Sequence, residues 1–405
     1  MADNKTIQVS PKTTWVGVLD KDIVTFDVVM ETKYGTTYNA YFINAQKKAV
    51  VETVKEKFWP VYKEKLSKLT ALNEIEYIIL NHTEPDHSGS VALLLNEAPN
   101  ATVIGTGNAI RYMKDLMNRD FPHRIVKDGD VLDLGDATLK FISAPNLHWP
   151  DSMYTWFEEE QLLFTCDSFG AHFAHDEMID NKVGNYDDAF DYYFNVILKP
   201  YSKFFLKAVE KIEPLPIKAI LNGHGPLLLN DWKRYVDRSK SMCEEYLKNP
   251  NAKSILVAYV SAYQKTTMIA QEIARGIESE SNIKAQLMDI ETASLGDLDA
   301  AITASNGLVL GSPTINQNIL MPAYKFLAAI CPIRDKGKPA GAFGSYGWSG
   351  ESAVLLKSMM ENLKLDFCGD GVFVKFTPSQ EELTLAFQYG KVLAEKVLER
   401  DAASN

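Results

Sequence analysis

Four side chains able to bind a metal lie within six positions of the sequence. His82, Glu84, Asp86 and His87 directly follow residues 75–80, an apolar and β-branched run that predicts a buried strand. Alternation along an extended backbone would direct the first three to one side, with His87 next to them on the turn. This is more ligands than one tetrahedral ion takes from a single loop. The spacing therefore favours two neighbouring metal ions, and the alternative is an ordinary polar loop.

Three further clusters repeat this pattern of an apolar strand followed by a metal-binding side chain. His148 stands in a His-Trp-Pro-Asp motif after a strand that ends near residue 142, Asp167 follows residues 162–164, and His224 follows residues 217–221. Ends of neighbouring strands lie close together even when they are far apart in sequence. Four independent coincidences would be needed if all of these were ordinary loop residues.

Composition limits the class of protein. At 405 residues the chain predicts two domains, and 46% hydrophobic with 23% charged residues is typical of globular proteins. It has no apolar run of the ~18 residues that span a membrane and no signal peptide at its start. A net charge of −11 argues against nucleic acid as a partner. The four cysteines form no Cys-x-x-Cys pair, which excludes a rubredoxin-like centre and favours reduced thiols in the cytoplasm.

The two halves of the chain have different patterns. The first half predicts an antiparallel meander over residues 14–51, a helix over 55–69 with a kink at Pro60, and strands with intervening helices. Two sheets enclosed by helices, an αββα arrangement, accommodate this order. Its last predicted helices cover 187–210 and 231–247, and residues 248–252 are the candidate linker.

From residue 253 the chain alternates regularly between strands and helices. This alternation predicts a doubly wound α/β domain, which binds its ligand at the carboxyl ends of the parallel strands. The predicted strands are 255–260, 285–288, 307–310 and 339–344, and the predicted helices are 267–278, 298–304, 323–331, 351–363 and 381–399.

Three loops at those strand ends combine hydroxyl and backbone polar groups with aromatic faces. The first precedes a helix whose free amides would hold a phosphate. No G-x-G-x-x-G follows the first strand, so FMN fits better than a nicotinamide dinucleotide. The alternative is that these are turn residues only. The candidate FMN residues are Ser261, Tyr263, Lys265, Thr266, Ser312, Pro313, Thr314, Ile315, Asn316, Ser345, Tyr346, Gly347, Trp348, Ser349 and Gly350.

With these motifs the chain resembles the flavodiiron proteins, or A-type flavoproteins, over nearly its whole length. The resemblance implies a metallo-β-lactamase-like domain over residues 1–250 that holds two irons, and a flavodoxin-like domain over 253–405 that holds FMN. Two positions depart from the family pattern. Gln264 and Lys265 replace smaller residues in the phosphate loop, and Gly223 precedes His224 where serine is expected.

The resemblance also implies a ligand set. One iron would take His82, Glu84 and His148, the other Asp86, His87 and His224, and Asp167 would bridge them. Hydrolases of this fold carry H-x-H-x-D-H and bind zinc, whereas Glu84 makes this site richer in carboxylate and better suited to iron. His172 is a candidate for contact with a bound gas, the alternative being a loop histidine. Tyr193 is a candidate for the pocket wall, the alternative being core packing.

The expected function is reduction of O2 to water, or of NO to N2O, at the diiron site. Electrons would come through FMN from rubredoxin, a flavin reductase or a reduced deazaflavin. The family pattern further implies a head-to-tail homodimer or a tetramer, with neither nucleic acid nor membrane as partner. Two alternatives are a binuclear zinc hydrolase fused to a flavodoxin module, and an electron carrier with a structural metal site. Glu84 argues against the first, and ligand positions left for substrate argue against the second.

Overall fold

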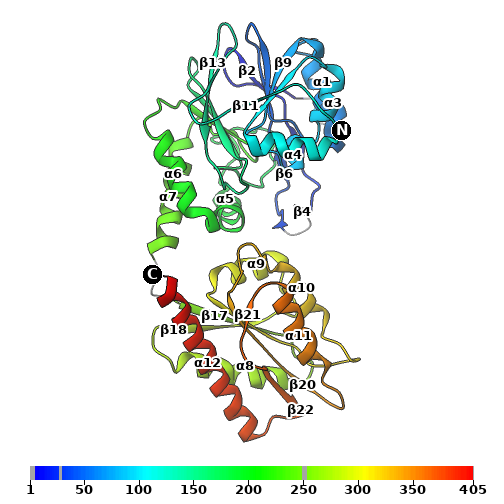
Figure 1. Ribbon diagram of the computed structural model, residues 1–405, viewed down its shortest axis with the longest axis vertical. Helices are drawn as coiled ribbons and strands as arrows, with labels where there is room; N and C mark the ends of the chain where they lie inside the picture. Colours follow the sequence, from blue (N-terminus) through cyan, green and yellow to red (C-terminus); the bar gives the residue numbers. More distant parts are fainter. Residues whose placement is uncertain (1–4, 27–29, 249–252, 405) are drawn as a thin grey trace. The chain divides into compact units, whose positions relative to one another are not determined.

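The computed structural model describes residues 5–26, 30–248 and 253–404. The chain divides into two compact units, residues 1–26 with 32–248 and residues 27–31 with 249–405 (Figure 1). Of the candidate linker, residues 248–252, all but Lys248 lie outside the described residues. None of the helices in the described part is long and apolar enough to cross a membrane.

The first unit contains two sheets with a shared core. Apolar side chains of both sheets pack together between them, among them Ile79 and Ile104 from the first and Phe141, Phe164 and Leu221 from the second. The first sheet has the order β1 (Ile7–Gln8), β2 (Thr13–Trp15), β7 (Tyr41–Ile43), β8 (Lys48–Val51), β9 (Ile75–Ile79), β10 (Thr102–Gly105) and β11 (His123–Ile125). The second has the order β12 (Val131–Asp133), β13 (Thr138–Ser143), β14 (Met153–Phe157), β15 (Leu162–Cys166) and β16 (Ala219–Asn222).

Helices cover these sheets. Those beside the first sheet are α1 (Trp59–Ser67), α3 (Val91–Glu97) and α4 (Gly107–Met117), and those beside the second are α6 (Ser202–Ile212) and α7 (Trp232–Lys248) (Figure 1). The predicted kink at Pro60 is wrong. Pro60 lies in the first turn of α1, where its missing N–H has no intrahelical partner to lose.

The predicted helix over residues 187–210 is not continuous. It consists of α5 (Asp187–Tyr193), a π-helical turn (Phe194–Leu198), a 3₁₀ turn (Lys199–Tyr201) and α6. Pro200 lies in the 3₁₀ turn and supplies no backbone N–H, which interrupts the α-helical ladder. The predicted meander over residues 14–51 is likewise divided, since β3 (Val18–Asp20) and β6 (Thr36–Tyr38) form a separate two-stranded ribbon.

The second unit has one parallel sheet with helices on both faces. The sheet order is β18 (Ile283–Asp289), β17 (Lys253–Tyr259), β19 (Gly307–Gly311), β20 (Pro339–Tyr346) and β21 (Asp366–Phe367), with β22 (Val372–Lys375) also paired to β20. One face packs on α9 (Leu295–Ala304), α10 (Met321–Ala329) and α11 (Glu351–Asn362), and the other on α8 (Lys265–Glu278) and α12 (Gln380–Ser404). β21 and β22, which are two and four residues long, were not predicted from the sequence.

Candidate metal centre and cofactor pocket

The loop after β9 carries four of the predicted ligands. His82 and Glu84 precede a short helix, α2 (Pro85–Ser88), and Asp86 and His87 lie within it. The predicted alternation of an extended chain is therefore wrong beyond Glu84, because the proline starts a helical turn there. The helical turn, rather than an extended backbone, brings Asp86 and His87 to the same centre as His82 and Glu84.

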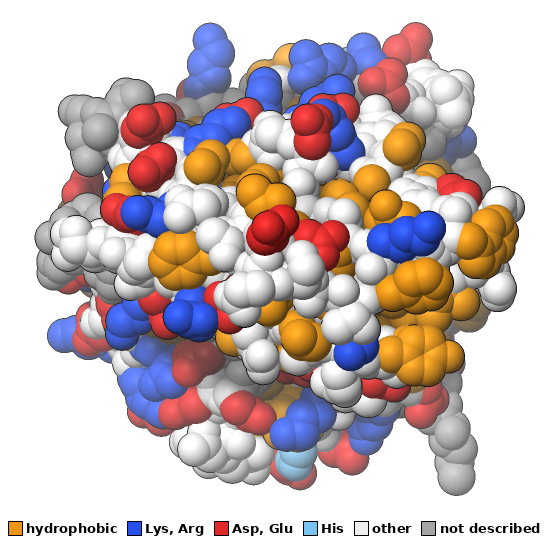
Figure 2. All heavy atoms as spheres, turned by 90° about the horizontal axis from the view of Figure 1, so that it is seen from below, with side chains coloured by type: hydrophobic (Ala, Val, Ile, Leu, Met, Phe, Trp, Pro, Cys, Tyr) orange, Lys and Arg blue, Asp and Glu red, His pale blue; other side chains and the backbone are white. Residues whose placement is uncertain are grey.

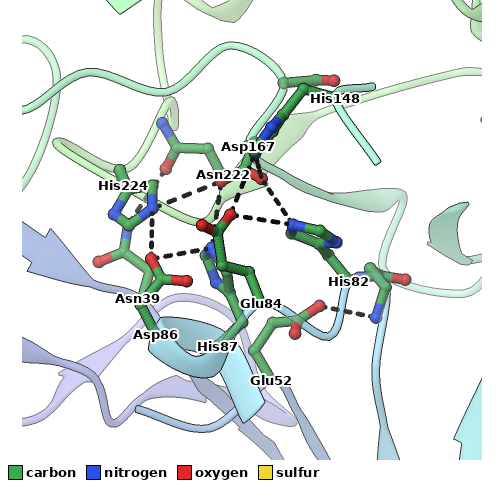
Figure 3. A network of polar contacts seen from close by, with 12 residues as sticks. Asn39, Glu52, His82, Glu84, Asp86, His87, His148, Asp167, Asn222 and His224 are labelled. Carbon is green, nitrogen blue, oxygen red and sulfur yellow. Dashed lines mark hydrogen bonds and ion pairs between the residues drawn. The ribbon is translucent and has the colours of Figure 1, made fainter. Parts of the chain in front are cut away.

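The other three ligands come from the second sheet. His148 lies in the loop between β13 and β14, Asp167 directly follows β15, and His224 follows β16 after one glycine. β15 and β16 are parallel. β13 and β15 are both antiparallel to β14, so β13 runs in the same direction as these two strands. The carboxyl ends of these strands therefore meet at one edge, and the structure brings all seven predicted ligands together there (Figure 3).

One oxygen of Asp167 faces a first group of ligands, which we call the first metal position. Asp167 Oδ2 lies 3.6 Å from His82 Nε2 and 3.4 Å from His148 Nε2. Glu84 Oε2 completes this group at 3.3 Å from His82 Nε2 and 3.1 Å from His148 Nε2.

The other oxygen of Asp167 faces the second metal position. Asp167 Oδ1 lies 3.1 Å from His87 Nε2 and 3.4 Å from His224 Nε2. Asp86 Oδ2 lies 3.3 Å and 3.1 Å from the same two nitrogens. Each metal position thus combines two imidazoles and one carboxylate, and Asp167 is shared between them.

These spacings fit ligands that share an ion. Two atoms each about 2.1 Å from one ion, at tetrahedral or right angles, are about 3.0–3.4 Å apart. Both oxygens of Asp86 and Oδ2 of Asp167 are buried and accept no well-formed hydrogen bond from any described residue, although histidine nitrogens lie close to them. A cation at each position would satisfy these oxygens.

Outer hydrogen bonds orient two of the histidines. His82 Nδ1 donates to Asp151 Oδ1 at 3.1 Å, and Asp151 Oδ2 accepts from the backbone N–H of Thr83 at 2.8 Å. His224 Nδ1 donates to the carbonyl oxygen of Thr37 at 2.6 Å. With the proton held at Nδ1, each ring presents the lone pair of Nε2 to the centre, as a metal ligand must. Neither partner was predicted from the sequence, although Asp151 lies within the His148 motif.

The electrostatics of the cluster favour cations. Burial alone would lower the pKa of His148 and His224, but the nearby carboxylates of Asp167, and of Glu84 or Asp86 respectively, outweigh it. They raise the pKa of His148 to about 9 and that of His224 to about 10. Burial would raise the pKa of Asp167, but its histidine partners hold that pKa well below its usual range. Divalent ions can therefore replace protons at this cluster.

The two predicted catalytic residues lie next to the second metal position. The Tyr193 hydroxyl donates to Asp167 Oδ1 at 3.1 Å, so this side chain contacts the shared carboxylate. His172 is buried, with Nδ1 2.9 Å from Thr36 Oγ1 and its ring stacked on Phe26 at a centroid distance of 4.5 Å. Burial lowers the pKa of His172 well below its ordinary value, which keeps the ring neutral.

The second unit has a pocket of about 320 Å³ at the loops predicted to bind FMN. The backbone N–H of Thr314 donates to the carbonyl oxygen of Ser345 at 2.9 Å, which joins two of the three loops. Eight predicted residues line the pocket, namely Tyr263, Lys265, Pro313, Thr314, Ile315, Ser345, Tyr346 and Gly347. A mostly apolar slot at the carboxyl ends of parallel strands suits a flat heterocycle.

The remaining predicted FMN residues do not line this pocket. Thr266 is buried with its hydroxyl 3.2 Å from that of Ser345, and the hydroxyl of Ser312 donates to the Pro313 carbonyl oxygen, so both brace the loops. Ser261, Asn316, Trp348, Ser349 and Gly350 also lie outside the lining. Two lining residues were missed, Phe376 and Thr377, which directly follow the missed strand β22.

Aromatic side chains stand exposed beside this pocket. Tyr263 is 80% exposed, Phe376 64%, and Trp348, which follows the lining residue Gly347, 78%. Figure 2, seen from the end of Figure 1 where β22 lies, shows apolar side chains gathered on one side of this face among charged ones. Exposed aromatic groups of this kind mark surfaces that bind another molecule.

Comparisons with known proteins agree with this architecture. A family model described as ODP family beta lactamase matches residues 36–225, and a flavodoxin model matches residues 257–390. These matches confirm the predicted fold class of a metallo-β-lactamase-like unit followed by a flavodoxin-like unit. The chain is also similar to solved structures over 98% of its length. These include the flavodiiron protein from Giardia intestinalis, covered over 98% of its chain (27% identity, TM-score 0.75), and rubredoxin oxygen:oxidoreductase from Desulfovibrio gigas, covered completely (26% identity, TM-score 0.76).

Curated relatives extend over the same length. The chain is 37% identical over 388 residues to Flavo-diiron protein FprA2 of Clostridium acetobutylicum, and this alignment covers 94% of this chain and 97% of the relative. It is 36% identical over 402 residues to Type A flavoprotein fprA of Rhodobacter capsulatus, which covers 98% and 92% respectively. The two metal positions that share a carboxylate, the flavin-sized pocket and these similarities agree. The chain therefore belongs to the flavodiiron (type A flavoprotein) family of oxidoreductases, whose cofactors are a pair of irons and FMN.

Proposed function

We propose that the protein reduces dioxygen to water, nitric oxide to nitrous oxide, or both, with electrons supplied through FMN. The observation that carries this proposal is the pair of metal positions on the two oxygens of Asp167. When bound, two irons supply the binding and reduction of a small gas, and FMN supplies stored electrons. A flavodoxin-like unit on the same chain accounts for the electron supply.

The residues of the chain have separable roles in this proposal. Four imidazoles and three carboxylates hold the metals. The shared carboxylate, Asp167, keeps the two metal positions adjacent. Tyr193 holds a proton at its hydroxyl, 3.1 Å from Asp167 Oδ1, where it can stabilise added negative charge. His172, neutral and buried, lines the side of His224 without adding a charge. Asp86, His87 and His224 at the second metal position are all buried, which keeps bulk water away from that side of the reaction.

The first experiment is to challenge the anaerobically reduced protein separately with O2 and NO. Gas consumption and flavin reoxidation are followed, with iron and zinc assayed on the same sample. Rapid reoxidation with about two irons per chain supports the proposal, and the ratio of rates gives the preferred gas. Two zincs with a flavin that stays reduced under both gases would instead support a hydrolase, the alternative that Glu84 argues against.

We further propose a separate electron-donor protein, rubredoxin or a flavin reductase, and a head-to-tail homodimer. In such a dimer the flavin of one copy serves the metals of the other. The exposed aromatic residues Tyr263, Trp348 and Phe376 support an interface at the flavin pocket.

Mixing two inactive variants tests the dimer. Asp167→Ala removes the metal pair and Tyr346→Ala weakens FMN binding, so each alone is expected to be inactive at low FMN. Unfolding and refolding them together would restore part of the activity in a head-to-tail dimer, because one intact pair of sites forms across the two copies. Absence of any recovery, with dimers present by light scattering, would contradict this arrangement.

A further inference from the structure

Gly223 lies between β16 and the ligand His224, and its backbone is held from both sides. Its N–H donates to the carbonyl oxygen of Cys166 at 2.5 Å, and its carbonyl oxygen accepts from the N–H of Asn39 at 2.9 Å. Its φ is not in the left-handed region, so the backbone conformation does not demand glycine. The reason for glycine at this position is the space beside it.

A side chain at this position would collide with the ring of His87. An added Cβ would lie 2.7 Å from His87 Cε1, and 3.0 and 3.1 Å from the carbonyl carbon and oxygen of Cys166. Ordinary contacts between carbon atoms are about 3.5–4.0 Å. The Cys166 atoms belong to a backbone that is itself hydrogen bonded to Gly223. The imidazole, which the added Cβ would approach most closely, is therefore the group that has to move furthest.

The backbone of His87 is held by hydrogen bonds, so its side-chain ring is the part that can move away from an added Cβ. Its backbone N–H donates to the carbonyl oxygen of Glu84 at 2.9 Å, and its carbonyl oxygen accepts from both the N–H and the hydroxyl of Thr53 at 2.7 Å. The ring now places Nε2 3.1 Å from Asp167 Oδ1 in the second metal position. A rotation about the side-chain bonds would remove that nitrogen from the metal.

The ring of His87 also lacks the outer anchor that two other ligand histidines have. His82 donates to Asp151 and His224 donates to the Thr37 carbonyl oxygen, but Nδ1 of His87 has no hydrogen-bond partner among the described residues. Glu52 lies behind it within 4.8 Å, and its Oε2 is likewise without a partner in the described part of the chain. Without a directional bond, the surrounding space decides where this ring lies.

We propose that Gly223 is the positioning residue that lets His87 serve as a metal ligand. A side chain at residue 223 would displace the imidazole and leave the second metal position with one nitrogen fewer. This inference rests on the proposed function, in that Asp86, His87, His224 and Asp167 hold one of the two metals. It makes residue 223 the determinant of whether the second metal has one or two histidine ligands from the protein.

The test is an anaerobic Co²⁺ titration of the metal-free full-length chain, followed by visible absorption, for the wild type, Gly223→Ala and Gly223→Ser. The wild type is expected to bind two ions. Both variants should bind the first ion normally and the second about 10–100-fold more weakly, the usual effect of losing support for a ligand. Gly107→Ala is the matched control, since its Cβ would meet only Ile125 Cγ2, at 4.0 Å.

A double variant shows whether the glycine acts through the histidine. His87→Ala should weaken the second ion as Gly223→Ala does, and the combination should be no weaker than His87→Ala alone. Additive losses, or wild-type binding by Gly223→Ala, would overturn the inference. If Gly223→Ala fails to fold, as judged by circular dichroism, removing the ring in the double variant should restore folding, and continued misfolding would overturn it too. A wild type that binds no metal pair would instead refute the proposed function.

Discussion

The metal centre and the flavin pocket hold their ligands in opposite ways. At the metal centre, charged side chains from four loops lie around Asp167, and three of their carboxylate oxygens have no hydrogen-bond partner among the described residues. At the flavin pocket, partly exposed aromatic faces and loop residues form an open slot. A buried charge is costly unless it is paired, so each charged side chain at the metal centre has little freedom of position. A flat ring held by many weak contacts tolerates variation in its surroundings.

The largest expected effect breaks the metal centre and spares the pocket. Asp167→Ala removes the carboxylate that both metal positions share, so both irons should be lost together and gas consumption should fall to background. The loss of affinity should exceed the about 10–100-fold typical of outer hydrogen-bond partners. Iron assay and FMN fluorescence on the same sample measure the two sites. Retention of two irons would show that the carboxylate is not shared.

Buried charge in the second unit serves the fold rather than the pocket. Asp335 is 1% exposed, and its carboxylate is paired with Arg334 and Lys338 at 2.8 Å, while Arg334 also pairs with Asp299 at 2.8 Å. Asp335→Asn should destabilise this unit by about 3–5 kcal/mol, because it leaves Lys338 without a carboxylate partner and Arg334 with Asp299 alone. Urea unfolding monitored by flavin fluorescence measures this loss. Asp370→Asn, which removes an exposed pair, is the control and should change little.

The same carboxylate predicts a pH dependence. Burial raises the pKa of Asp335, but Arg334 and Lys338 outweigh burial and lower it below its ordinary value. A lowered pKa in the folded state gives stability that is fully present above about pH 4 and is lost as the pH falls below it. Urea midpoints measured between neutral and acidic pH should therefore fall in the wild type and vary less in Asp335→Asn. Equal slopes for the two proteins would contradict this assignment.

An intermediate effect is expected at the pocket alone. Tyr346→Ala removes an aromatic face from the lining and should weaken FMN binding by about 1–3 kcal/mol, or roughly 5–150-fold, the range of ring stacking. Tyr346→Phe keeps the face and should bind FMN normally. Fluorescence titration with FMN measures both, and iron content should not change in either. Loss of iron in Tyr346→Ala would mean that the two sites are not held independently.

The smallest expected effect lies at the edge of the metal centre. Tyr193→Phe removes one hydrogen bond to Asp167, worth about 1.5 kcal/mol for a charged acceptor, so turnover should fall about 10-fold with both irons retained. Tyr154→Phe is a matched control, because that buried hydroxyl donates to Ser168 rather than to the cluster. Iron loss in Tyr193→Phe, or an equal effect of the control, would assign Tyr193 to packing.

The ligands themselves could be predicted from sequence because their signal is local. Each lies in the loop or turn that follows a largely apolar strand, and strand ends meet at one edge of a sheet. The groups that orient the ligands could not be predicted. Thr37 acts through its backbone carbonyl, which has no sequence signature, and nothing in the His148 motif assigns Asp151 to His82. Their positions are set by how distant segments pack.

The fold shows the same limit at its shortest elements. The regular alternation of the second unit was sufficient to predict the sheet from β17 to β20. β21 and β22 owe their existence to pairing with β20 over a few residues, and no periodicity can be read from so short a run. Missing β22 meant missing Phe376 and Thr377 in the pocket wall. Pro60 was predicted to kink a helix but lies in the first turn of α1. A proline kinks a helix only in its interior, and the residue at which this helix begins could not be read from the sequence.

The spread of the ligands along the chain has a consequence during synthesis. About 140 residues separate His82 from His224, which at ~5–20 residues per second take the ribosome about 7–28 s to make. For that interval the turn at His82–His87 already offers four donors while His224 is still missing, and Asp167 is missing too for the first 85 of these residues. Any divalent ion then present can bind the nascent turn, and copper and zinc bind such donors more tightly than ferrous iron. The supply of metals around the ribosome, as much as the finished site, therefore bears on which ions this protein carries.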